Sequence, residues 1–354
     1  MPDVISWDVA SRVAKNVAGY FPVPPRSEIH SLEADLISIF PEAQNEVAAA
    51  TGLAVTGSAA PQVMSRAQWA EANITSFKST LAPLLEQLSE RLPRWRMSGA
   101  SAGVAGVQLG AILGWLSSKV LGQFDVILAD AGIDRDQDTV YFVAPNIISV
   151  EMKYGFDQQQ FRHWIALHEL THRAQFNGVE WMRGYFKELL HDSISLANPD
   201  PRVFFDALKK AFESIREGRN PIAENGPIAV FATPEQMMIL NRISGLMSLL
   251  EGHGDVIMNR AGASDILQSA RFAEIFAERH NSQRGFAKLM SQLLGTEAKM
   301  RQYQEGERFV HRVEEFGGTD LFNKVWERPE NLPDIADIRE PDLWIERMTT
   351  KSGF

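Results

Sequence analysis

Two histidines and a glutamate, His168, Glu169 and His172, form an H-E-x-x-H pattern inside a stretch with helical periodicity. Histidines four residues apart project from one face of a helix, close enough for both imidazoles to bind one ion. Glu169 is turned by about 100° from His168, where its carboxylate can accept a proton from metal-bound water. The pattern predicts a catalytic metal site with Glu169 as general base. A chance match on an amphipathic helix with two structural histidines is the alternative.

A zinc ion at such a site needs a third protein ligand, and residues 233–258 offer the strongest candidates. A Thr-Pro pair predicts the start of a helix there, and its apolar composition predicts that the helix is buried. A buried Glu251 would need a cation or a partner, so we expect it to be the third ligand. Asp255, one turn later, could accept the free N–H of a ligating histidine. His253 is the alternative ligand, although it points about 200° away from Glu251.

The composition excludes some kinds of active site and disfavours one kind of partner. The chain has 354 residues, no cysteine, and a formal net charge of −10 at pH 7 from 45 acidic and 35 basic residues. Thiolate nucleophiles and Cys-based zinc sites are therefore excluded, and any metal must be held by His, Asp or Glu. The acidic balance disfavours a nucleic-acid partner. The first residues lack the pattern of a secretory signal, so we expect a cytoplasmic protein.

Residues 97–118 carry no charge over about the length of a membrane span. They consist mostly of Gly, Ala and Ser, which add little transfer energy, and their glycines recur at helical spacing. We expect a buried helix that another helix approaches closely. A helix that contacts a membrane is the alternative.

The remaining patterns predict a mainly α protein with a small β-sheet. Short β-branched or aromatic runs at 125–129 and 139–144 predict strands, and helical periodicity dominates residues 4–17, 29–50, 62–92 and most of 158–316. Residues 140–143 could form an edge strand that pairs with an extended peptide, or be purely structural. We expect a helical entry segment at 1–60, continuous with one catalytic domain at 61–354, because helices some 80 residues apart must meet at one ion.

Several motifs together resemble a known family. They are H-E-L-T-H at 168–172, T-P-E-Q at 233–236, L-L-E-G-H at 249–253 and the run from Gly295 to Trp344. From about residue 60 onward the chain resembles the zincin-like family of gluzincin type, whose members carry hydrolase labels and sometimes a label of deazaflavin coenzyme biosynthesis. The resemblance implies a mostly helical zincin-like metallopeptidase fold with a metal site at His168, His172 and the Glu251 region. It supplies no substrate.

These observations predict a zinc-dependent hydrolase, above all a metallopeptidase. One zinc ion would be held by His168, His172 and Glu251, and its water, activated by Glu169, would attack a peptide carbonyl. The alternatives are a non-peptidic zinc hydrolase acting on an amide or ester of a small metabolite, and a non-catalytic metal-binding interaction protein. We expect a peptide or small amide substrate, with no nucleic acid and no membrane span. Candidate groups for stabilising the oxyanion are Tyr303, His253, His280 and His311.

Overall fold

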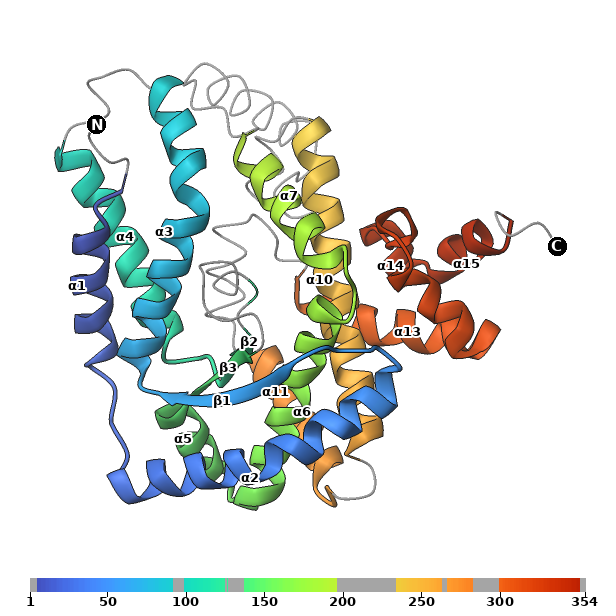
Figure 1. Cartoon of the computed structure of the whole chain (residues 1–354), viewed down its shortest axis with the longest axis horizontal. Helices are drawn as coiled ribbons and strands as arrows, with labels where there is room; N and C mark the ends of the chain where they lie inside the picture. The colour runs from blue at the N-terminus through green and yellow to red at the C-terminus, as the bar shows by residue number, and fades with distance from the viewer. Residues whose placement is uncertain are drawn as a thin grey trace, which may run out of the picture. The chain divides into compact units, whose positions relative to one another are not determined.

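The computed structural model describes residues 5–91, 99–124, 126, 137–195, 234–262, 266–282 and 299–350. Within these ranges the chain is mainly helical with one three-stranded sheet (Figure 1), which confirms the predicted fold class. It divides into two compact units. The first comprises Met1–Gly178 and Arg260–Ser269, and the second comprises Val179–Asn259 and Ala270–Phe354.

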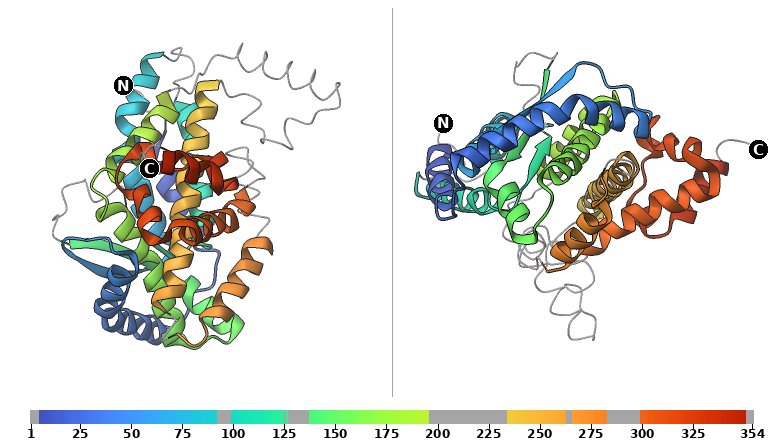
Figure 2. Two further views of the ribbon diagram at one scale, coloured as in Figure 1. Left: turned by 90° about the vertical axis from the view of Figure 1, so that its right-hand side faces the viewer. Right: turned by 90° about the horizontal axis from the view of Figure 1, so that it is seen from below.

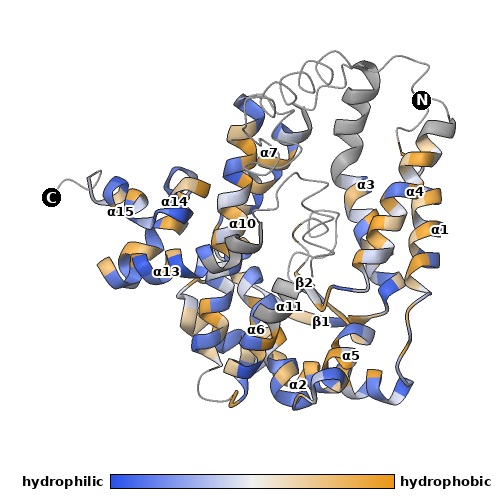
Figure 3. Cartoon of the chain, turned by 180° about the vertical axis from the view of Figure 1, so that it is seen from behind, coloured by the Kyte–Doolittle hydropathy of each residue, from blue (hydrophilic) through white to orange (hydrophobic). Residues whose placement is uncertain are grey.

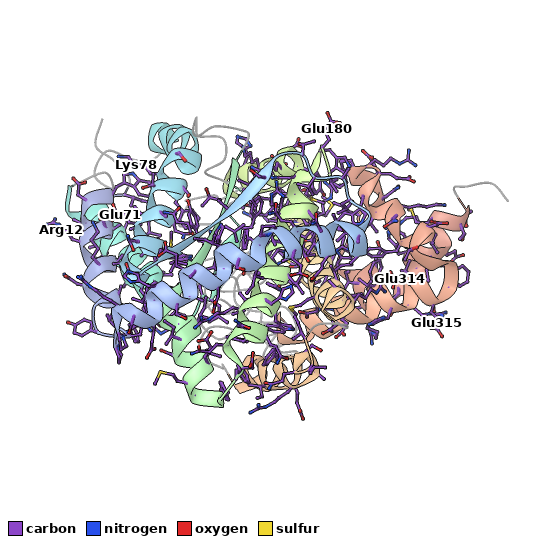
Figure 4. The ribbon with its side chains drawn as sticks, turned by 60° about the horizontal axis from the view of Figure 1, so that its bottom comes forward. Arg12, Glu71, Lys78, Glu180, Glu314 and Glu315 are labelled. Carbon is purple, nitrogen blue, oxygen red and sulfur yellow. The ribbon has the colours of Figure 1, made fainter. Side chains whose placement is uncertain are left out.

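Three helices of the first unit lie side by side (Figure 1). They are α1 (Trp7–Ala18), α3 (Arg66–Arg91) and α4 (Gly99–Leu116), and each contacts the other two. Hydrophobic residues recur along α1 and along the coloured parts of α3 and α4 (Figure 3). At their outer side, Ser11 and Lys15 of α1 reach the carboxylate of Glu71 on α3, at 2.6 and 3.0 Å (Figure 4).

The closest approach is between α1 and α4. A Cβ built on Gly110 of α4 would lie 2.3 Å from the carbonyl oxygen of Ala10, and one built on Gly114 would lie 2.7 Å from that of Ala14. The absence of side chains at these positions lets the two backbones come together. The expected close helix contact in the uncharged stretch is therefore confirmed. Its burial is one-sided, because Val104 and Val107 on α4 are exposed.

The membrane alternative for this stretch receives no support. Among the described residues, no helix combines the length and apolar character needed to span a bilayer.

The sheet consists of β1 (Ser58–Met64), β2 (Gly122–Phe124) and β3 (Gln137–Val143), in the order β1-β3-β2. Strand β1 is parallel to β3, and β2 is antiparallel to it. The strand predicted at 139–144 is confirmed as β3. Of the strand predicted at 125–129, residues 125 and 127–129 lie outside the described residues and Val126 lies in a turn. Strand β2 directly precedes this range and was not predicted.

Of the two alternatives for residues 140–143, the edge strand is wrong and the purely structural strand agrees with the structure. These residues belong to β3, the central strand, which pairs with β1 on one side and with β2 on the other. The backbone N–H and C=O groups of β3 therefore form hydrogen bonds to β1 and β2 within the sheet.

Three further helices of the first unit pack below the sheet (Figures 1 and 2). They are α2 (Arg26–Thr51), α5 (Ala144–Tyr154) and α6 (Gln158–Asn177). Helix α2 contacts β1, α5 and α6, and α6 contacts β2. This packing fixes α6, which carries the H-E-x-x-H residues, against the strand at one edge of the sheet.

A buried ion-pair network joins these helices. The Arg162 guanidinium of α6 donates to both carboxylate oxygens of Glu151 on α5, at 2.8 and 2.9 Å, and to Asp35 on α2, at 2.6 Å. Arg162 is 1% and Glu151 2% exposed. Burial raises the pKa of the Glu151 carboxyl, and Arg162 opposes that shift. The bidentate pair gives each of the two buried charges, Arg162 and Glu151, an oppositely charged partner.

Helices joined by short turns make up the described residues of the second unit. Its elements are α7 (Met182–Ser195), α10 (Pro234–Ala261), α11 (Ser269–Ser282), α13 (Lys299–Phe322), two 3-10 helices at Asn323–Trp326 and Pro329–Asn331, α14 (Ile335–Arg339) and α15 (Pro341–Thr350). The last residues of α10 and the first of α11 belong to the first unit. Glycines bring α10 and α13 together, since a Cβ built on Gly252 would lie 2.2 Å from the carbonyl carbon of Gly306.

The C-terminal part of this unit encloses Trp344 of α15. Its ring packs edge-on against Phe309 of α13, and its Nε1 donates to the carbonyl of Asn331 at 2.6 Å. On α13, Glu315 is exposed and Glu314 is partly exposed (Figure 4).

Candidate metal centre

Helix α6 presents the H-E-x-x-H residues, and its local sequence explains why it forms. The Asp157 side chain caps the first turn by accepting from the backbone N–H of Gln160 at 3.0 Å. No proline or glycine interrupts residues 158–177, and Gly178 follows the last helical residue. Most residues from 161 to 176 are buried, and His168 and His172 are among the few in this range that are partly exposed.

The two histidines point their Nε2 atoms at one another, 3.2 Å apart, with the rings nearly perpendicular. Two nitrogens bound to one tetrahedral zinc at about 2.05 Å would be separated by about 3.3 Å. The observed separation therefore fits a shared zinc ion with little adjustment. This arrangement is what the four-residue spacing predicts.

Gln175 fixes the orientation of one of these rings. Its side-chain oxygen lies 2.9 Å from Nδ1 of His172, and Gln175 is completely buried. Because that oxygen can only accept, Nδ1 carries the proton and Nε2 keeps its lone pair for a metal. The sequence analysis missed this role, although Gln175 stands three residues after His172 on the same side of the helix, a spacing at which side chains meet.

Glu169, the predicted general base, is 6% exposed. Its Oε2 accepts a hydrogen bond from the backbone N–H of Phe124 in β2, at 3.1 Å. The neighbouring Gly122 leaves room for the carboxylate, since a Cβ built there would lie 2.6 Å from Oε1. Nothing in the sequence pointed to this contact, because β2 is only three residues long and lies 45 residues upstream of the glutamate.

Glu251 and Asp255 lie on α10, one turn apart, and both are half-buried. The helix begins at Pro234, as predicted, but its burial is confined to residues 245–258, whereas the first part is partly exposed. Glu251 belongs to the second unit, and its role as the third ligand stays a prediction. Two imidazoles and a carboxylate form a donor set suited to zinc.

His253, the alternative ligand, is packed among aromatic rings. Its imidazole stacks on Phe322 with ring centroids 5.2 Å apart, meets Trp326 edge-on at 5.1 Å, and is 3% exposed. Of the other candidates for stabilising an oxyanion, His311 is exposed and lies 3.8 Å from Glu307. The side chains of Tyr303 and His280 lie outside the described residues.

Histidines four residues apart on one helix, with a glutamate directly after the first, are the arrangement of metal-dependent hydrolases. The family model described as zincin-like metallopeptidase matches residues 5–345. The chain therefore belongs to the zincin-like metallopeptidase family, and the match includes the N-terminal helices as well as the residues from 60 onward.

A solved structure is similar over nearly the whole chain. It is a crystal structure from Chloroflexus aurantiacus, described as a putative hydrolase with a novel fold, with 31% sequence identity and a TM-score of 0.73. The similarity covers 98% of this chain and 99% of that one. No curated protein matches the chain.

Proposed function

We propose that the protein is a zinc-dependent hydrolase that cleaves amide bonds, as a metallopeptidase does, with one ion held by His168, His172 and Glu251. The observation that carries the proposal is the pair of imidazoles on α6, whose Nε2 atoms lie 3.2 Å apart, with Glu169 directly after the first of them. Two histidines and a glutamate leave a fourth position of a zinc ion for water or substrate. Membership of a metallopeptidase family supports the same reaction class.

When bound, zinc lowers the pKa of a water molecule and polarises the carbonyl of the substrate. Glu169 is the group that moves protons: it accepts one from the attacking water and delivers one to the leaving nitrogen. The hydrogen bond from the Phe124 N–H orients its carboxylate. The contact between Gln175 and His172 keeps the lone pair of His172 Nε2 available to the ion.

Asp255 completes the proposal as a positioning residue. Nδ1 of His172 already has Gln175 as its acceptor. We therefore assign the carboxylate of Asp255, one turn after Glu251, to the ring N–H of His168. Replacement of Asp255 by Asn should weaken zinc binding without removing a ligand.

The test combines metal analysis with a single substitution. Wild-type protein and Glu169→Gln are compared for zinc content by elemental analysis and for cleavage of a quenched-fluorescent peptide library. We expect one zinc per chain in both, and a loss of cleavage of at least about 100-fold in the variant. Absence of zinc from both proteins, or equal cleavage by both, would overturn the proposal.

A second pair of variants tests the third ligand. Glu251→Ala should lose zinc, whereas His253→Ala should keep it, because the ring of His253 packs between Phe322 and Trp326. The reverse outcome would transfer the role to His253. Running the same proteins on p-nitrophenyl esters and acyl anilides separates a peptidase from a zinc hydrolase of small amides or esters.

A further inference from the structure

The backbone of strand β2 lies directly against the side chain of Glu169. A Cβ built on Gly122 would lie 2.6 Å from Oε1, 2.7 Å from Cγ and 2.8 Å from Cδ of that glutamate. Real Cβ atoms do not approach other heavy atoms this closely, so any residue larger than glycine at position 122 would have to displace the carboxylate or the strand.

The pairing of β2 with β3 directs a hydrogen-bond donor to the same carboxylate. The register places Gly122 opposite Phe142 and Phe124 opposite Val140, and the Val143 N–H donates to the carbonyl of Leu121. In an antiparallel ladder, bonded and non-bonded positions alternate, so the N–H of Phe124 points away from β3. It donates instead to Oε2 of Glu169, at 3.1 Å.

We propose that β2 is the element that positions the general base, with Gly122 providing the space for the Glu169 carboxylate and Phe124 the donor that orients it. Gly122 and Phe124 are thus positioning residues for the reaction. This inference rests on the proposed function for its catalytic meaning. The coupling between Gly122 and Glu169 is a property of the fold that can be measured without metal or substrate.

The composition of β2 supports this role over ordinary sheet packing. Gly122 is the first residue of β2, and the absence of a side chain there allows the close approach of another group. Glu169 is 6% exposed, and a carboxylate buried to that degree needs hydrogen-bond donors. One glycine and one backbone N–H therefore meet the steric and the polar needs of the same side chain.

A double-mutant cycle tests the coupling. Thermal unfolding midpoints are measured on metal-free wild type, Gly122→Ala, Glu169→Ala and the double variant. We expect Gly122→Ala to lower the midpoint by at least about 2 °C in the wild-type background, and to lower it little or not at all in the Glu169→Ala background, where the space is empty. An equal effect in both backgrounds, or no effect in the wild-type background, would overturn the proposal.

Gly103→Ala provides the matched control, because a Cβ built on Gly103 of α4 meets nothing within 4 Å. Its effect on the midpoint should be the same in both backgrounds, since alanine is simply the better helix former at that position.

Measurements of kcat and KM test whether β2 positions Glu169 for the reaction. Gly122→Ala should retain zinc and lose at least about tenfold in kcat on the peptide library with little change in KM, as expected when a proton-transfer group is misplaced. An unchanged kcat would overturn the positioning role. If the wild type cleaves nothing, the proposed function fails, and the unfolding cycle still decides whether β2 sets the place of Glu169.

Discussion

The carboxylate of Glu169 on α6 accepts a hydrogen bond from the backbone N–H of Phe124 in β2, at 3.1 Å. This contact gives the two common substitutions of a general base different structural consequences. Glutamine keeps an oxygen that can accept from the Phe124 N–H, whereas alanine leaves that buried donor without it.

We therefore expect Glu169→Ala to be less stable than Glu169→Gln by about 1–3 kcal/mol, although both should lose hydrolysis. Urea unfolding of the two metal-free variants measures the difference. Equal unfolding free energies would show that the Phe124 hydrogen bond contributes nothing to the fold.

The contact between Gln175 and His172 predicts an effect on metal affinity. Gln175→Leu removes the acceptor for the Nδ1 proton of His172, so zinc affinity should fall about 10- to 100-fold. Gln175→Glu keeps an acceptor at the same place and should bind zinc at least as tightly as the wild type. Competition with a chromophoric chelator measures both.

Gln108→Leu on the exposed face of α4 is the control for the loss of a glutamine. If it changes zinc affinity as much as Gln175→Leu does, the effect of Gln175 is not exerted through His172.

Much of α6 could be predicted from the sequence, because its evidence is local. The four-residue spacing of His168 and His172 places both rings on one face, and their Nε2 atoms meet at 3.2 Å. The partners of this helix were not predictable in the same way. Gly122 and Phe124 approach Glu169 only through the sheet, and a three-residue strand leaves almost no pattern in a sequence.

Strand β1 shows the same limit. Its sequence, SAAPQVM, lacks alternating β-branched or aromatic residues, and Pro61 disfavours a strand. Proline is tolerated here because β1 is an edge strand of the sheet formed by the described residues, with Pro61 opposite Val140 of β3. Such a parallel pairing depends on contacts far apart in the chain, so local patterns do not reveal it.

The Arg162 network predicts that removing one partner of the buried ion pair costs more stability than removing both. Arg162→Met leaves Glu151, which is 2% exposed, without its bidentate partner and should cost about 3–5 kcal/mol. Replacing both Arg162 by Met and Glu151 by Leu should cost less than Arg162→Met alone, because no unpaired buried charge remains. Urea unfolding of metal-free protein measures these differences.

Arg12→Met is the comparison for a lost arginine at the exposed surface of α1 (Figure 4), where the guanidinium donates to the Asp8 carbonyl. Its effect should stay within about 0.5 kcal/mol. A double variant less stable than Arg162→Met would contradict the assignment of the cost to an unpaired carboxylate.

The α1–α4 contact predicts that the same Gly→Ala change has opposite signs at two positions of one helix. At Gly103 the added methyl meets nothing within 4 Å, so the higher helix propensity of alanine should stabilise the protein by up to about 1 kcal/mol. At Gly110 it would lie 2.3 Å from the Ala10 carbonyl oxygen and 2.9 Å from the Val13 Cβ. The helices would have to separate, so Gly110→Ala should be destabilising by about 1–3 kcal/mol.

Thermal and urea unfolding of the two single variants measure whether each substitution raises or lowers the stability of the protein. If Gly110→Ala stabilised the protein as Gly103→Ala does, α4 would not pack on α1 through its glycines. The uncharged, glycine-rich stretch would then need another explanation than close packing of two helices, because a propensity gain alone would account for both substitutions.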